Sequence, residues 1–563
     1  MPRSLRGALC LSFACAAAFG LAACGGDDSS DSAGSSTTGG TAATDAGGKA
    51  GGTIKTAYTS FPDYLDPALS YTQEGWQSLW TVYTPLLTYK HADGAEGATV
   101  VPGLAEAMPD ISADGKTYTL KLRSGLKYSD DKAVKASDFE HSIKRVLNLE
   151  SGGASFYSGI VGAEKYIKDG KAQADISGIV TDDATGDITI ELLKPDGRFP
   201  YILTMVFASL VPGDTPFKNM TKDPPAGVGP YKFENVRINR GYDLVKIPDF
   251  AVTDQQVGKL DKIEVEIIKN RRRQTQDTIQ NKIDYMNDPP APDQLRDVRA
   301  QYTDKRYKEF VTNSTYYYFL NHKVAPFDKP EVRQAVNFAV DKRSLARLFG
   351  GLLEPGCNFL PPGMKGYEKV DPCPWGDPTA APDVEKAKAL IKSAGVEGDA
   401  VTVFGNDEPE SKSLAEYLSD VLNDIGLKAK PRIVEGSVYF ATIGNQKTKA
   451  QAGFANWFQD FPHPGNFFFL VDGKSIQDTN NQNFGNVDVP EINAIFNKAD
   501  QNADIDAVAG EYARADKLLV EGAHVVPYGH RKLTVFYSER MDFDNCTVWH
   551  PVYNLDFTNL CLK

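Results

Sequence analysis

The chain has 563 residues, of which 41% are hydrophobic and 24% charged, and its formal net charge is −13. This length is enough for several domains with a large core, and the composition is ordinary for a globular protein. Nucleic-acid binding needs a concentrated basic surface, which the charge balance disfavours. The dense basic run at residues 270–276 is interpreted as a solvated loop or the start of a helix.

The N-terminal segment has the features of an export signal. Arg3 and Arg6 precede an apolar run that is too short to span a membrane, and the run ends in Leu-Ala-Ala-Cys at Cys24. This ending resembles the lipobox of bacterial lipoproteins, in which a small-residue cleavage site precedes a cysteine that receives lipid. We therefore expect residues 1–23 to be a signal peptide and Cys24 to be lipidated. The alternative is an ordinary signal peptide followed by a chance cysteine.

Residues 24–52 have the composition of a flexible tether. They are rich in Gly, Ser, Thr and Asp and show no apolar periodicity. A tether suits a globular body that stands away from a membrane, so it favours the lipoprotein interpretation. No other stretch approaches 18 consecutive apolar residues, and we expect no second anchor.

Apolar periodicity then predicts the first strands and helices. Alternation of apolar and polar residues predicts strands at 116–123, 187–194 and 262–269. Ser137 and Glu140 have the spacing of a capping box, and the apolar stripe behind them predicts a helix over 137–149. Further helices are predicted at 330–349 and 383–394.

Residues 400–458 follow the order of an α/β domain. Strands are predicted at 400–405 and 427–434, with a helix over 413–426 between them and Gly426 as its terminator. Another apolar run follows at 452–458. This order predicts a partly parallel sheet. The sequence contains no internal repeat.

Four cysteines follow Cys24, an even number in a chain expected to be exported. Their close spacing predicts two local disulfides, Cys357–Cys373 and Cys546–Cys561. A site in which all four cysteines bind a metal is the rival interpretation, but the C-x2-C spacing of such sites is missing. We expect neither a metal nor a cofactor.

The motifs of common enzymes are missing from the sequence. There is no G-x-S-x-G, no H-E-x-x-H, no P-loop and no G-x-G-x-x-G after a strand, and the seven histidines are scattered. Acidic residues are so abundant that a glycosidase pair could not be recognised among them. An enzyme is therefore disfavoured.

Several ordered segments resemble one family, the extracellular solute-binding proteins of family 5, which are peptide-binding lipoproteins of ABC importers. The most specific segment is 101–145, with Pro-Gly-Leu-Ala-Glu, an Asp-Gly before a strand, a Leu-Arg-x-Gly turn and an Ala-x-Asp-Phe helix start. Residues 65–90, 227–233 and 316–342 also resemble family segments, with Val228 in place of a usual Thr. The resemblance covers about 53–563.

The resemblance implies an α/β fold like that of the periplasmic binding proteins, with two lobes around a hinge and an extra subdomain on lobe I. By analogy the segments are 53–100, 210–315 and 535–563 for lobe I, 101–209 for the extra subdomain, and 316–534 for lobe II.

The segment "WFQDFPHP" resembles the family's W-x-x-D-Y-x-x-P element, with Phe461 in place of Tyr. In peptide-binding members the aspartate of this element receives the ligand's α-ammonium group, and the matching residue here is Asp460. A charge-assisted pair of this kind is stronger in a closed, dry cleft than in water. We expect Trp457, Phe458 and Phe461 to exclude water from the cleft. Plain core packing is the alternative for these aromatics.

Three further ligand contacts are expected with less support from the pattern. Members of the family place an aromatic of the segment "SFYSG" against the ligand backbone, and Tyr157 is the choice there. Tyr71 and Asn406 are chosen because they fall in loops expected to line the cleft.

The resemblance implies a lipid-anchored binding protein that captures dipeptides or oligopeptides without chemistry. It is expected on the outer side of the cell membrane, as a monomer that delivers ligand to a separate permease and ATPase and binds no nucleic acid. The alternatives are a family member that binds a nickel chelate, an oligosaccharide or an opine, and a sensory lipoprotein that presents peptides. An exported enzyme is a more distant alternative.

Overall fold

The computed structural model describes residues 48–169, 174–248, 250, 252 and 258–563. The expected signal peptide, Cys24 and most of the expected tether lie outside these residues. Among the described helices, none combines the length and the apolar character that crossing a membrane requires.

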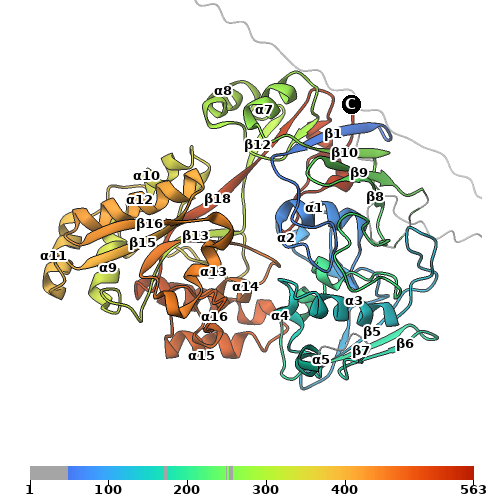
Figure 1. Cartoon of the computed structure of the whole chain (residues 1–563), viewed down its shortest axis with the longest axis horizontal. Coiled ribbons are helices and arrows are strands. Elements are labelled where there is room, and N and C mark those ends of the chain that lie inside the picture. The colour runs from blue at the N-terminus through green and yellow to red at the C-terminus, as the bar shows by residue number, and fades with distance from the viewer. Residues whose placement is uncertain (1–47, 170–173, 249, 251, 253–257) are drawn as a thin grey trace, which may run out of the picture. The chain divides into compact units, whose positions relative to one another are not determined.

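The described residues contain a twelve-stranded sheet with one long strand, β18 (Val526–Tyr537), near its middle (Figure 1). The strands on one side of β18 are β1 (Thr53–Tyr58), β8 (Tyr231–Arg237), β9 (Gly241–Lys246), β10 (Lys262–Ile267), β11 (Tyr285–Met286) and β12 (Tyr307–Val311). Those on the other side are β13 (Ser314–Leu320), β14 (Leu353–Pro355), β15 (Ala400–Asn406), β16 (Lys428–Val434) and β17 (Ala452–Phe458).

Strand β18 belongs to two hydrophobic cores. Its first half pairs with β13 and β14, and Val526 and Tyr528 lie in the core of the second lobe. Its second half pairs with β11 and β12, and Val535 and Tyr537 lie in the core of the first lobe. The two lobes are therefore two cores joined by a continuous strand and by the β12–β13 connection that runs beside it (Figure 1).

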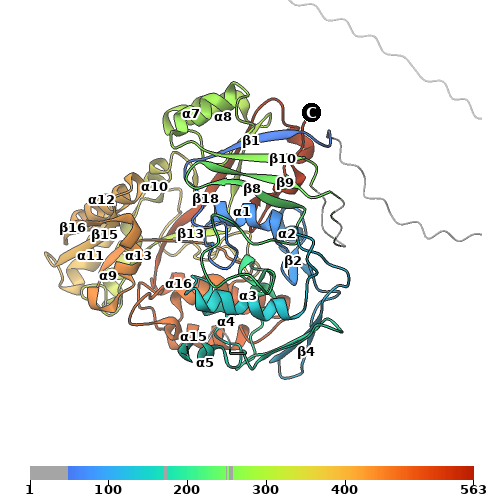
Figure 2. The ribbon, with the colours of Figure 1, turned by 45° about the vertical axis from the view of Figure 1, so that its right-hand side comes forward.

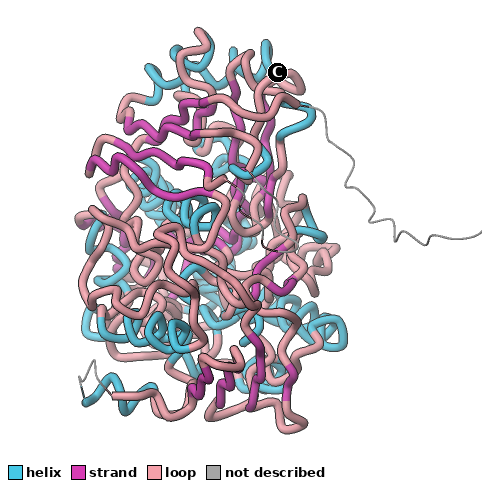
Figure 3. Tube along the Cα trace, turned by 90° about the vertical axis from the view of Figure 1, so that its right-hand side faces the viewer, coloured by secondary structure: helices cyan, strands magenta, loops and turns pink. Residues whose placement is uncertain are grey.

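A separate four-stranded antiparallel sheet lies within residues 101–209 and appears apart from the long strands in Figure 3. Its strands are β4 (Asp110–Ile111), β5 (Thr117–Lys121), β6 (Ile179–Asp182) and β7 (Asp187–Glu191). Two strands predicted from alternation, at 116–123 and 187–194, are confirmed as β5 and β7. Tyr118 and Leu120 pack into the first-lobe core, so this sheet extends that core.

The helix predicted at 137–149 is confirmed as α3 (Ser137–Asn148), but the predicted capping box is wrong. The N-cap residue is Ala136, and it makes no side-chain capping hydrogen bond. The backbone N–H and hydroxyl of Ser137 both donate to the Asp183 carboxylate, and Glu140 accepts from the backbone N–H of Ile176. Tertiary partners therefore take both groups that the capping box needs.

The α/β order predicted for 400–458 is confirmed. Strand β15 pairs in parallel with β16 and β17, and α12 (Pro409–Asp424) connects β15 to β16. Gly426 follows this helix with φ of +107°, a backbone conformation that favours glycine. The region predicted to be helical at 330–349 contains two helices, α9 (Pro330–Ala339) and α10 (Lys342–Leu348). Asp341 accepts from two backbone N–H groups at the start of α10.

The remaining longer helices are α1 (Gln73–Val82), α5 (Ala163–Asp169), α7 (Arg271–Ile279), α8 (Pro292–Tyr302), α11 (Val384–Ala394), α15 (Pro490–Ala499) and α16 (Ile505–Glu521). Short helices include α4 (Ala154–Tyr157), α13 (Tyr439–Ile443) and α14 (Gly465–Phe468). The basic run at 270–276 is the start of α7.

The lobes also touch on the side where Figures 1 and 2 show α15 and α16 next to α4. The segment before α6 (Phe199–Ile202) makes the contact with Asp500, which follows α15. The backbone N–H of Gly197 donates to the carbonyl of Asp500 at 2.8 Å. The guanidinium of Arg198 lies 3.7 Å from the Asp500 carboxylate. These contacts hold the two cores together on one side.

The four described cysteines are bonded in two pairs. Cys357 is joined to Cys373, with Cα atoms 6.0 Å apart, and Cys546 to Cys561, with Cα atoms 5.7 Å apart. Each bond closes a short loop within one region of the chain.

Candidate ligand-binding site

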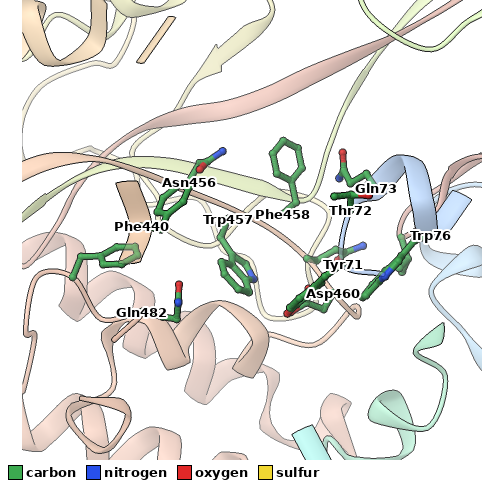
Figure 4. A pocket seen from close by; sticks show the side chains of 13 residues that line it. Tyr71, Thr72, Gln73, Trp76, Phe440, Asn456, Trp457, Phe458, Asp460 and Gln482 are labelled. Carbon is green, nitrogen blue, oxygen red and sulfur yellow. The ribbon is translucent and has the colours of Figure 1, made fainter. Parts of the chain in front are cut away.

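A cavity of about 440 Å³ lies between the start of α1 and the end of β17 (Figure 4). Its volume is within the usual range for small-molecule sites. The first lobe contributes Tyr71, Thr72, Gln73, Trp76 and Val552. The second lobe contributes Phe440, Asn456, Trp457, Phe458, Gln459, Asp460, Gln482 and Phe484. Six of these thirteen side chains are aromatic, four are amides and one is a carboxylate.

Asp460 follows the end of β17 and is held by one neighbouring amide. Its side chain is only 7% exposed. The Asn466 amide donates to Oδ2 of Asp460 at 2.8 Å. The Asn466 carbonyl oxygen accepts from the backbone N–H of Asp460 and from the indole N–H of Trp457. Asn466 thereby fixes both the carboxylate and the neighbouring ring at the cavity wall.

The carboxylate of Asp460 lacks a cationic partner among the described residues. Burial raises the pKa of Asp460 to about 7, although hydrogen bonds from Asn466 and Tyr71 act in the opposite direction. A desolvated carboxylate without a counter-charge is costly, so it is partly protonated at neutral pH. A cation that entered the cavity would stabilise the ionised form.

Tyr71 brings the first lobe to this carboxylate. Its backbone N–H donates to Asp63 at 2.6 Å, and its ring stacks on Trp76 with centroids 5.6 Å apart. Phe207 packs edge-on against the Tyr71 ring at 5.3 Å. Because packing fixes the ring, the Tyr71 hydroxyl is directed at Asp460 across the boundary between the lobes (Figure 4).

The structure brings together four of the residues chosen from the sequence. Tyr71, Trp457, Phe458 and Asp460 all line the cavity. The ring of Trp457 packs edge-on against Phe469 at 5.0 Å, which leaves its indole at the cavity wall.

The other three residues chosen from the sequence do not line the cavity. Tyr157 is fully buried in the first-lobe core, where its hydroxyl donates to the carbonyl of Ile202 at 3.3 Å. Phe461 is 2% exposed and packs against Phe156, because the chain turns after Asp460 and directs the next ring into the first lobe. Asn406 is also buried.

Asn406 has a local structural role. Its side-chain oxygen accepts from the backbone N–H of Glu408, and its own backbone N–H donates to Ser411. These bonds shape the turn that leads from β15 into α12. Asn406, like Tyr157 and Phe461, therefore lies outside the lining of this cavity, where the sequence interpretation expected a ligand contact.

The sequence interpretation missed several cavity residues, including Trp76, Phe440 and Phe484. Trp76 belongs to the apolar stripe of α1, which a pattern cannot distinguish from core. Phe440 could have been noticed as one of two adjacent aromatics shortly after a predicted strand. Phe484 lies in a loop without periodicity, and no local signal identifies it.

Two α/β cores that share a strand, with a solute-sized cavity between them, define the class of two-lobed solute-binding proteins. The family described as "Bacterial extracellular solute-binding proteins, family 5 Middle" matches residues 99–478. The chain therefore belongs to family 5 of these proteins, whose members are transport binders and not enzymes.

Proteins similar in sequence include the dipeptide-binding protein DppE of Bacillus subtilis, at 25% identity over 88% of this chain and 89% of that protein. Another is the heme-binding protein A of Haemophilus influenzae, at 27% identity over 80% of this chain and 81% of that protein. Among solved structures, the clavulanic acid biosynthesis oligopeptide binding protein 2 has a TM-score of 0.83. It is 23% identical, with 91% of this chain and 96% of that chain covered. The last likeness supports the two-lobed fold.

Proposed function

We propose that this protein captures peptides in the cavity between its lobes, with the ligand's α-ammonium group paired to Asp460. The observation that carries the proposal is the buried Asp460 carboxylate, which faces a cavity without a cationic partner from the described residues. The names of relatives that bind dipeptides support a peptide as the ligand. An ammonium group would supply the missing charge in a desolvated site, where such a pair is strong.

The proposed mechanism is capture and delivery without chemistry. The amide side chains of Gln73, Asn456 and Gln482 offer hydrogen-bond donors and acceptors to the main chain of the ligand. The extended ligand would thus be held by main-chain hydrogen bonds, as a strand is in a sheet. Motion about β18 and the β12–β13 connection would open and close the cavity. The closed protein would then deliver its ligand to a separate permease and ATPase.

The test is a calorimetric cycle with wild type and Asp460→Asn against a free peptide and its N-acetylated form. Asparagine keeps the shape of the side chain and removes the charge. Losing one partner of a desolvated pair costs about 2–5 kcal/mol, or about 30-fold to several thousand-fold in affinity. N-acetylation should weaken binding to the wild type similarly. The two losses should not add, because both remove the same interaction.

Asp420→Asn is the matched control, because it removes one negative charge from an exposed position on α12. It should bind both peptides as the wild type does. Equal affinity of the wild type for free and acetylated peptide would refute the role of Asp460. The protein would then bind a ligand recognised through other groups, and the same calorimeter cell can test heme or an oligosaccharide.

The proposal includes a lipid anchor at Cys24, which supports capture close to a membrane permease. The expected lipobox ending at Cys24 and the polar residues that follow support this anchor. Cys24→Ser should release the protein from membranes into the soluble fraction, with peptide affinity unchanged. A variant that still sediments with membranes in detergent-free buffer would show that the anchor lies elsewhere.

A further inference from the structure

The cavity is chemically different at its two ends. Asp460, Tyr71 and Trp76 lie at one end, Phe440 and Gln482 lie at the other, and Trp457 lies between them (Figure 4). The first end carries the buried carboxylate. The second end is bounded by the rings of Phe440 and Phe484, so it offers an apolar surface to the ligand.

Phe440 is unusually uncovered for a large apolar side chain. It is 40% exposed, whereas its stacking partner Phe484 is 3% exposed. The two ring centroids are 5.9 Å apart at an interplanar angle of 27°, and the ring of Phe454 lies 6.2 Å from that of Phe440. Further apolar burial on this stack would be favourable, and an aromatic ring would add favourable ring geometry.

The position of this stack is fixed by hydrogen bonds between two segments. The backbone N–H of Asn481 donates to the carbonyl of Gly444 at 3.0 Å, which links the Phe484 loop to the end of α13. Inside the loop, the Asn483 amide donates to the carbonyl of Val487 at 2.8 Å, and the Val487 N–H donates back to the Asn483 side-chain oxygen. A wall held in this way loses little entropy when a ligand binds to it.

The distance between the two ends suits a short extended peptide. Phe454 lies beside Phe440, and Phe458 ends the same strand near Asp460. Phe454 and Phe458 are four residues apart on β17, and at about 3.3 Å per residue this separation is about 13 Å. An extended ligand covers a similar length per residue, so the wall accommodates about four residues.

We propose that Phe440 and Phe484 form a subsite for an aromatic side chain of the ligand, carried by a residue that follows the N-terminal one. This inference rests on the proposed function, because the ammonium group at Asp460 defines the direction of the ligand. It assigns a specificity role to Phe440, which the sequence pattern did not select, and it identifies the preferred ligands as peptides that contain an aromatic residue.

The test uses tetra-alanine and three variants of it, each with one Phe at the second, third or fourth position. Calorimetry is performed with the wild type, Phe440→Ala and Val438→Ala. Val438 is the matched control because it is 44% exposed, lies two residues away and does not line the cavity. Phe440 is sufficiently exposed that its truncation should leave the fold intact, and circular dichroism checks this.

At one position, Phe should raise the affinity of the wild type and of Val438→Ala by about tenfold over tetra-alanine, the range expected for burying a ring against a ring. For Phe440→Ala the affinity for the Phe-containing peptide, divided by the same variant's affinity for tetra-alanine, should fall to about one. The inference is overturned if no position shows a gain, or if the gain survives in Phe440→Ala.

The outcome is separable from that of the proposed function. If N-acetylation leaves wild-type affinity unchanged while Phe440→Ala abolishes the gain, the subsite stands and the role of Asp460 fails. If N-acetylation weakens binding and no phenylalanine position shows a gain, the role of Asp460 stands and the aromatic subsite fails.

Discussion

Asn466 and Asp460 form a reciprocal pair, in which the Asn466 amide donates to the Asp460 carboxylate at 2.8 Å and accepts the Asp460 backbone N–H at 2.8 Å. Asn466 is 1% exposed and also accepts from the indole of Trp457, so it positions both the carboxylate and this ring at the charged end of the cavity. The carboxylate is thus oriented before any ligand arrives, which reduces the entropy lost on binding.

Replacing Asn466 should therefore weaken peptide binding, although Asn466 itself is not proposed to contact the ligand. A hydrogen bond to a charged group contributes about 1.5–3 kcal/mol, so Asn466→Leu should lower peptide affinity by about 10- to 100-fold. Calorimetry with free peptide measures the loss. With the N-acetylated peptide the loss should be much smaller, because the carboxylate then has no ammonium partner. A loss equal for both peptides would show that Asn466 acts on the fold and not on Asp460.

Peptide affinity should depend on pH through Asp460. Burial raises the pKa of Asp460 to about 7 in the free protein, and pairing with an ammonium group lowers it in the complex. The complex then binds fewer protons than the free protein. Peptide affinity should thus be at its maximum above pH 7. Below pH 7 it should fall by up to about tenfold for each pH unit.

Calorimetry at pH 6 in two buffers of different ionisation enthalpy measures this effect as the release of close to one proton on binding. At pH 8 the release from Asp460 should vanish. Asp460→Asn should remove the release at pH 6, and proton release that persists in this variant would assign the titration to another group.

The buried pair of Arg145 and Asp66 should be a large contributor to the integrity of the first lobe. Both side chains are 0% exposed, and two N–H groups of Arg145 donate to the two oxygens of Asp66 at 3.0 and 2.8 Å. Arg145→Met leaves the Asp66 charge buried and should lower the free energy of unfolding by about 3–5 kcal/mol in urea titrations.

The control for this change is Arg296→Met, since the Arg296 side chain is 93% exposed. Its effect should lie within about 0.5 kcal/mol. If Arg145→Met is equally mild, the pair contributes little net stability and the site around Asp66 readily rehydrates.

The Cys357–Cys373 bond should stabilise the second lobe. It joins cysteines 16 residues apart, and closing a loop of this size contributes about 3 kcal/mol in the loop-entropy account. The Cys357→Ser, Cys373→Ser double variant should lose about this much against urea. Non-reducing peptide mapping that recovers both cysteines as free thiols in the wild type would contradict the prediction.

The sequence predicted the α/β order because strands such as β15 and β16 carry their periodicity in a few consecutive residues. It did not predict that Asp183 and Ile176 take the polar groups of Ser137 and Glu140, since those partners lie some 40 residues away in the chain. Capping is a local rule, and a tertiary partner can override it.

Cavity residues that belong to a recognisable motif were chosen from the sequence. Cavity residues that only the three-dimensional fold brings there were missed. Asp460 and Trp457, which line the cavity, were chosen because they sit in a recognisable segment. Phe461 directly follows Asp460 in the chain but lies in the first-lobe core, because the chain turns between Asp460 and Phe461. A pattern of residue types does not indicate into which lobe such a turn directs an aromatic ring.

Strand β18 has a consequence for how the chain acquires its structure. Strand β1 of the first lobe lies near the start of the described residues. Strands β11 and β12 of the same lobe pair with residues of β18 beyond Arg531, near the end of the sequence. During synthesis, neither core can close until the ribosome has translated nearly the whole sequence. A chain that stays incompletely folded for this long suits an export route that threads unfolded polypeptide through a membrane. Cutting the gene between β12 and β13 should thus yield an N-terminal fragment that lacks β18, the strand with which its β11 and β12 pair, whereas the C-terminal fragment keeps β13 to β18.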